Sequence, residues 1–211
     1  LLLLLSALVL FLFCVLLGGT AEVVKNWSNY QSETWNPFRK GILRNIRHSL
    51  LFFLVVMALI AMAFIAIPFY ISMGNIFGML VAVLLFWVEF LTIVALSYYY
   101  PLMNLLPGDD SLKTLKKCFL ILFDNLGFSI LLFAHNLLDL GLSIFTMGIM
   151  PGVCGLMLGT MDAGKLLMKK YDWQEENPGR SKSDMDWDEL LFEEKENLGP
   201  RTLKNMIFPW K

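Results

Sequence analysis

The chain has 211 residues, of which 57% are hydrophobic and only 17% are charged, and its mean hydropathy is +0.62. Soluble domains are roughly 45–50% apolar and about 25% charged. This composition leaves too little polar surface to cover a soluble core, so it excludes a soluble globular enzyme. The formal net charge of −1 gives no basic field, which argues against a nucleic-acid partner.

Five apolar stretches predict an all-α integral membrane protein with five transmembrane helices. Each is near the ~20 residues that a helix rising 1.5 Å per residue needs to cross about 30 Å of hydrocarbon. They are continuously apolar, without the alternation of a barrel strand. We expect a transmembrane domain over 1–170 and an acidic cytoplasmic tail over 171–211. The five stretches cover about 1–17, 49–70, 76–100, 118–138 and 142–161.

The connections between these stretches predict the orientation. All 17 Lys and Arg residues fall on one side of a five-crossing topology. Basic residues accumulate on the cytoplasmic side of a membrane. The N-terminus is therefore expected outside and the C-terminus inside.

One alternative for the first stretch stays open. The chain begins without Met, so we expect residues to precede Leu1. The run 1–17 and the small residues Gly18–Ala21 also resemble the end of a signal peptide with its cleavage site. Cleavage would leave the basic residues from Lys25 to Arg47 outside, against the charge rule.

Two basic stretches predict short amphipathic helices at the cytoplasmic surface. In the first, Phe38, Ile42, Ile46 and Leu50 recur every four residues and form one helical stripe. The basic residues lie off that stripe, where they would contact anionic lipid headgroups. The interfacial basic residues are Arg39, Lys40, Arg44, Arg47, Lys113, Lys116 and Lys117.

Polar residues inside the predicted crossings form a candidate intramembrane cluster. An ionisable group at such depth is costly and is expected to face the bundle interior beside a partner. One interpretation is an ion or substrate pathway, and the other is hydrogen bonding that holds helices together. We favour the second, because the cluster is small. Its members are Glu89, Asp124, Asn125, Asp162 and Lys165.

The acidic tail ends in a segment with apolar residues at helical spacing. Its residues Leu203, Ile207, Phe208 and Trp210 are predicted to dock onto the bilayer or a partner. The rest of the tail is compatible with disorder, although Asp184–Trp187 is predicted to cap a short helix through Glu193.

No catalytic or phosphate-binding motif is present, and His48 and His135 are predicted on opposite membrane faces. Cys14, Cys118 and Cys154 are scattered and are expected to be reduced thiols. We therefore expect no enzymatic activity, no cofactor and no metal site.

Several short motifs follow one another in a characteristic order along the chain. They are Gly19-Thr20-Ala21, Phe38 with Arg44-Asn45, Tyr100-Pro101-Leu102, Ser111–Lys116 and Pro151-Gly152. Their order resembles the YesL-like family of bacterial membrane proteins. The family is uncharacterised and is commonly encoded beside carbohydrate ABC transporters. The resemblance implies a multi-pass protein of the bacterial inner membrane and an ABC transporter permease, or another membrane subunit, as partner.

The expected function is that of a non-enzymatic membrane accessory or scaffold protein, associated through the resemblance with a carbohydrate ABC transport system. The alternative is a small secondary transporter or channel that uses the intramembrane carboxylates.

Overall fold

The computed structural model describes residues 2–149, 151–180, 184–192 and 195–196. Every regular element in these ranges is helical, and none of them is a strand. The chain divides into two compact units, Leu1–Lys165 and Leu166–Lys211. This division falls slightly before the boundary that we predicted at residue 170.

Four helical stretches in the described chain are long and apolar enough to cross a membrane, which makes the chain a candidate multi-pass membrane protein. They overlap the first four predicted crossings in order. The stretches are Leu4–Ser28, Ile46–Ser72, Ile76–Leu105 and Leu126–Phe145.

The first span is longer than the predicted 1–17. Helix α1 covers Leu2–Ser28, so residues 18–28, which we had placed in a connection, continue the helix. The connection begins at its end, where Tyr30 has a φ of 60°. That left-handed conformation is unusual for a residue with a Cβ, and it turns the chain out of the helical path.

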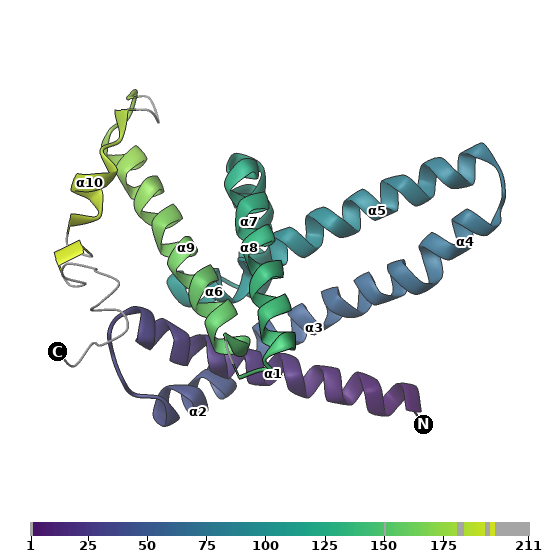
Figure 1. The fold of residues 1–211 in the computed structure, drawn as a ribbon, viewed down its shortest axis with the longest axis horizontal. Helices are drawn as coiled ribbons and strands as arrows, with labels where there is room; N and C mark the ends of the chain where they lie inside the picture. The colour runs from purple at the N-terminus through teal and green to yellow at the C-terminus, as the bar shows by residue number, and fades with distance from the viewer. Residues whose placement is uncertain (1, 150, 181–183, 193–194, 197–211) are drawn as a thin grey trace. The chain divides into compact units, whose positions relative to one another are not determined.

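Helix α2 (Trp35–Arg44) folds back along α1, as Figure 1 shows. It ends at Asn45, whose φ of −97° and ψ of 8° interrupt the helix before α3 (Ile46–Ala61) begins. The apolar stripe predicted over Phe38 to Leu50 is therefore not one continuous surface. Phe38 lies against α1, whereas Leu50 is exposed on α3.

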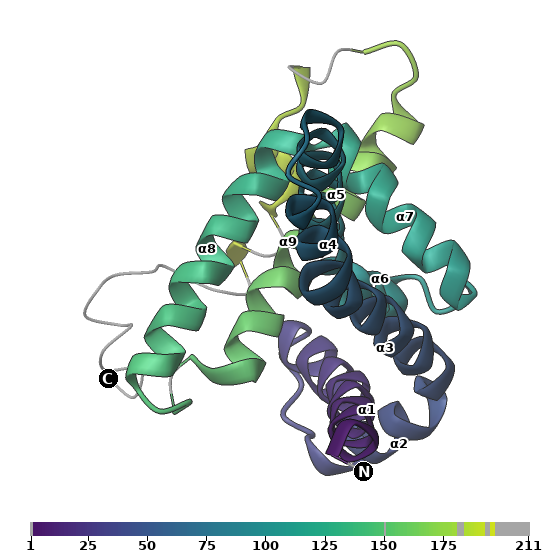
Figure 2. The same ribbon diagram turned by 90° about the vertical axis from the view of Figure 1, so that its right-hand side faces the viewer.

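The second and third spans form a helical hairpin, which Figure 1 shows from the side and Figure 2 end-on. Its first arm is α3, the π-helical turn η1 (Met62–Ala66) and α4 (Ile67–Ser72), and its second arm is α5 (Ile76–Leu96). In η1 the Ile67 N–H bonds to the Met62 carbonyl, five residues back. The following Pro68 has no N–H for the helical ladder, and a widened turn accommodates such an interruption.

Helix α6 (Tyr99–Leu105) lies in the core of the first unit. Its side chains from Tyr99 to Asn104 are all buried, and Tyr98 just before it is fully covered. The Tyr98 hydroxyl hydrogen-bonds the Ser129 hydroxyl at 2.9 Å, and the Tyr100 hydroxyl donates to the Cys14 carbonyl at 2.8 Å. These buried hydroxyls therefore have partners, as burial requires.

The fourth and fifth predicted crossings differ from the helices found. Helix α7 (Ser111–Asp124) ends at Asn125, α8 covers Leu126–Phe145 and α9 covers Gly152–Glu176. The predicted stretch 118–138 thus combines parts of α7 and α8. The predicted stretch 142–161 contains the turn between α8 and α9 in place of a continuous helix.

The physical reason for that turn lies in its backbone. Met147, Gly148 and Gly152 have φ values of 54°, 81° and 63°. Pro151 has no N–H to donate to a helical bond. The described residues on either side of this turn therefore belong to two separate helices, α8 and α9.

The second unit contains the later part of α9 and the short helix α10 (Trp187–Leu190). The Asp186 carboxylate accepts from the N–H groups of Asp188 and Glu189 at 2.8 and 3.4 Å, so the predicted acidic cap is confirmed. An ion pair with Lys195 lowers the pKa of Asp188. The predicted docking residues Leu203, Ile207, Phe208 and Trp210 lie outside the described residues.

Candidate functional site

Helices α1 and α2 approach closely because glycines face each other at their crossing. A Cβ added to Gly41 would lie 3.1 Å from the Cα of Gly19 and 2.8 Å from the Cβ of Glu22. A Cβ added to Gly19 would lie 2.8 Å from Ile42 and 2.9 Å from Phe38. Small residues permit this approach between membrane helices.

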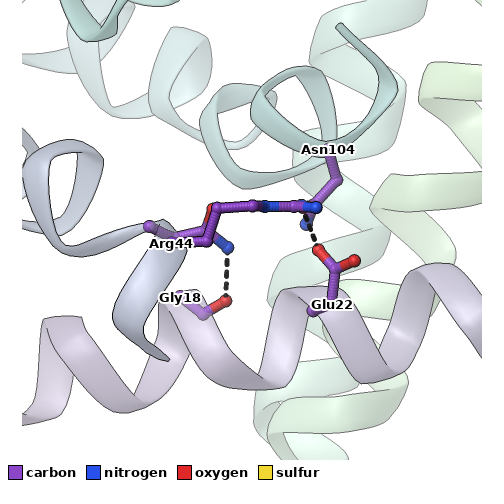
Figure 3. Close-up of polar contacts among 5 residues, drawn as sticks. Gly18, Glu22, Arg44 and Asn104 are labelled. Atoms are coloured by element: carbon purple, nitrogen blue, oxygen red, sulfur yellow. Dashed lines mark hydrogen bonds and ion pairs between the residues drawn. The ribbon is translucent and has the colours of Figure 1, made fainter. Parts of the chain in front are cut away.

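The close approach places one arginine among three helices, as Figure 3 shows. Arg44, the last residue of α2, forms an ion pair with Glu22 of α1 through Nη2. The same nitrogen donates to the Asn104 side-chain oxygen at 3.1 Å. Asn104 belongs to α6 and is fully buried. Arg44 therefore joins the ends of the first and third spans to the start of the second.

Asn45 extends this network into α1. Its Nδ2 donates to the Gly18 carbonyl at 3.0 Å, and its side chain is 2% exposed. We call the residues Gly18, Glu22, Arg44, Asn45 and Asn104 the Arg44 junction. A polar groove of about 640 Å³ opens beside it between α1 and α2, with Glu33 and Lys40 in its lining.

The predicted interfacial residues of α2 and α3 divide into two groups. Arg39, Lys40 and Arg47 are exposed, and their contact with headgroups stays a prediction. Arg44 instead turns toward Glu22 and Asn104, although about half of its side chain stays accessible. Arg44 is therefore a tertiary contact as well as a surface charge.

The lysines at the start of α7 gather around one carboxylate. Asp109 pairs with Lys113 at 2.6 Å and with Lys117, and its own side chain is 7% exposed. These two ion pairs lower the pKa of Asp109. Asp110, the residue before α7, makes no side-chain hydrogen bond to the start of the helix. Asp109 instead offsets the positive charge at this helix end through its two ion pairs. Lys116 is exposed.

Glu89 lies in an apolar groove between the two arms of the hairpin. The groove has a volume of about 510 Å³ and is lined by α3, η1 and α5. Every other lining side chain is apolar except Ser97. Glu89 lies near the middle of the 30-residue span Ile76–Leu105. Within the described part of the chain, no hydrogen bond or ion pair of its carboxylate is found.

The other members of the predicted intramembrane cluster have different surroundings. The Asn125 amide donates to Ile121 and Asp124 at the end of α7. Asp162 accepts from the Ser28 hydroxyl at 2.6 Å. Lys165 donates to the Ser28 carbonyl at 2.6 Å and to the Asn29 side chain at 2.7 Å. Asp162 and Lys165 thus both contact the end of α1.

Sequence reasoning missed two residues of the Arg44 junction, Glu22 and Asn104. Glu22 could have been found from its spacing. It follows Gly18 by four residues, and that spacing places both residues on one helix face. Asn104 gave no local signal, since its contact with Arg44 joins residues 60 positions apart.

The described residues contain no group of three His, Cys, Asp or Glu side chains placed to hold a metal ion. All three cysteines are free thiols. No family model matches the chain, and neither curated proteins nor solved structures give a match. The resemblance to the YesL-like family stays a prediction.

Proposed function

We propose that this chain is a non-enzymatic accessory protein of the membrane, which docks onto another membrane protein through the α3–α5 hairpin. The observation that carries the proposal is the exposure of this hairpin. In the span Ile46–Ser72, Ser49 and Leu59 are the described residues that the chain buries, and η1 and α4 have none. Phe64 is 78% exposed on one arm and Phe77 is 66% exposed on the other. Both arms are therefore available to lipid or to a partner helix.

A five-crossing topology with the N-terminus outside and the C-terminus inside belongs to the same proposal. One further passage would bring the basic residues after the fourth span to the same side as the other basic residues, and α9 would supply it despite its lower hydropathy. The contact of Lys165 with Ser28 and Asn29 supports this, because it places the basic end of that passage beside the end of α1. A short crossing is tolerated where the bilayer thins around it.

The resemblance to the YesL-like family supplies the proposed setting. It implies the bacterial inner membrane and a carbohydrate ABC transporter, whose permease is the expected partner. The exposed Arg39, Lys40 and Arg47 would hold the cytoplasmic surface against anionic lipid headgroups. The terminal residues Leu203 to Trp210 are proposed as a second docking segment.

The experiment is a pull-down in mild detergent with identification of recovered proteins by mass spectrometry. Ala63 lines the groove, whereas Ile65 lies on the same π-helical turn outside it. Ala63→Trp should fill the groove and lower recovery of the partner, while Ile65→Trp should leave recovery unchanged. Stoichiometric recovery of a membrane protein with the native chain supports the proposal. Absence of any stoichiometric membrane partner contradicts it.

The alternative function, a small secondary transporter or channel, is favoured by one observation, the position of Glu89 in a groove at the middle of its span. Coupled transport through this carboxylate would be abolished by Glu89→Gln in liposomes. An accessory protein is expected to transport nothing in liposomes, whereas a transporter is expected to transport its substrate. The two functions therefore predict opposite results for the purified native chain.

A further inference from the structure

The groove that contains Glu89 is elongated along the hairpin. On its first arm, the lining runs from Phe52 to Phe64, which corresponds to about three turns of helix. On its second arm, Glu89, Ile93 and Leu96 follow at spacings of four and three, which places them on one face of α5. An elongated apolar occupant fits this shape.

The Glu89 carboxylate determines which kind of elongated apolar occupant fits the groove. A charged or polar group in hydrocarbon is costly unless it pairs with another group. A lipid acyl chain fills an apolar groove but offers no hydrogen-bond donor. The occupant that complements both the apolar lining and Glu89 is a transmembrane helix with a donor side chain at the same depth.

The four spans of this chain carry no Lys or Arg at that depth. Lys25 and Arg47 are the Lys and Arg residues within the four spans, and both lie close to span ends. His135 lies at the middle of the span Leu126–Phe145, and its Nδ1 is 3.3 Å from Asp139 of the same helix. A second copy would bring no Lys or Arg to the middle of the membrane, so a Lys or Arg that pairs with Glu89 would come from a different chain.

We infer that the Glu89 groove binds a transmembrane helix that carries one basic side chain near the middle of the bilayer. The inference rests on the proposed accessory function and specifies the chemistry of its partner. The basic group pairs with the Glu89 carboxylate, and the apolar side chains on either side of it pack against Val56, Ile60 and Ile93. The pair keeps two ionisable groups out of contact with hydrocarbon.

The test measures the association of peptides with the full chain in phosphatidylcholine vesicles by energy transfer. Three labelled leucine-rich transmembrane peptides differ only at the central residue, which is Lys, Gln or Leu. The native chain should bind the Lys peptide about tenfold more tightly than the Leu peptide, the size expected for one strong polar contact between membrane helices.

Three variants make the test specific. Glu89→Gln keeps the side-chain size and should abolish the preference for Lys over Gln, whereas Glu89→Asp keeps the charge and should retain part of it. Thr92→Val is the matched control, because the Thr92 hydroxyl bonds to Val88 within α5 and lies outside the groove lining. Far-ultraviolet circular dichroism of each variant checks that its helices form.

Equal binding of the Lys and Leu peptides to the native chain would overturn the inference. So would a Lys preference that survives in Glu89→Gln, or displacement of the Lys peptide by a second copy of the chain. If the Lys preference is absent while the pull-down recovers a membrane partner, this inference fails and the accessory function stands. If the Lys peptide binds as expected and no partner is recovered, the accessory function fails and the groove assignment stands.

Discussion

The Nη2 of Arg44 lies 3.1 Å from the side-chain oxygen of Asn104 and joins the end of α2 to the buried helix α6. The same nitrogen pairs with Glu22 of α1. The guanidinium presents several donors in a fixed planar arrangement, which a lysine does not reproduce.

Arg44→Lys should therefore destabilise the first unit although it keeps the charge. We expect a loss of about 1–2 kcal/mol, which lies between the typical net value of a hydrogen bond and that of one to a charged group, because about half of the Arg44 side chain stays accessible. The measurement is unfolding in mixed micelles with increasing denaturing detergent. Arg39→Lys, an exposed position on the same helix, is the control and should change stability little. Equal effects of the two substitutions would contradict a structural role for the Arg44 junction.

Gly41→Ala should separate α1 from α2. The added Cβ would lie 3.1 Å from the Gly19 Cα and 3.2 Å from its carbonyl oxygen, and backbone atoms cannot move aside as a flexible side chain can. Overpacking of this kind costs typically about 1–3 kcal/mol. Unfolding in the same micelles measures the loss.

Gly127 on α8 provides the matched control for that substitution. A Cβ added there meets no atom within 4 Å, and Gly127→Ala should be neutral or slightly stabilising, because alanine favours helix. A destabilisation by Gly127→Ala as large as that by Gly41→Ala would show that the effect does not come from the α1–α2 contact.

The stability of the start of α7 should depend on pH through Asp109. Because its ion pairs lower its pKa in the folded state, the stabilisation is fully present above the ordinary carboxyl pKa near 3.9 and is lost as pH falls below it. The native chain should lose more stability than Asp109→Asn between about pH 5 and pH 3.

Asp110→Asn is the control for the pH experiment. Asp110 is the adjacent residue, is exposed and makes no side-chain cap bond, so its variant should follow the pH dependence of the native chain. A native pH profile that matches that of Asp109→Asn would show that the two lysine pairs contribute no stability.

The four candidate membrane spans were predictable because hydropathy depends on local composition. Stretches such as 76–100 contain no charge except Glu89, and a helix is the structure that satisfies the backbone of such a stretch in hydrocarbon. The end of the first span was misplaced because Glu22 and Lys25 are typical of a connection. In the structure, Glu22 is paired with Arg44, so the helix continues through a charged residue.

The stretch 142–161 was predicted as one crossing, because Pro151 and Gly152 in the sequence are compatible with a kinked helix as well as with a turn. The left-handed backbone at Met147, a residue with a side chain, could not be foreseen from composition. The Arg44 junction depends on a contact across 60 residues with Asn104, and no pattern within one helix encodes such a pairing. Glu89 was predicted as an intramembrane carboxylate, but its groove required the hairpin geometry.

Docking through the α3–α5 hairpin is tested most directly by photo-crosslinking in intact membranes. The photoreactive benzoylphenylalanine replaces Phe64, which lines the groove and is 78% exposed. Phe145 on α8, 87% exposed, is the control position. The account predicts a discrete adduct from position 64 whose modified residues lie in a transmembrane helix of another membrane protein, and no such adduct from position 145. Lipid adducts alone from position 64, with the chain folded and in its membrane, would contradict docking through the hairpin.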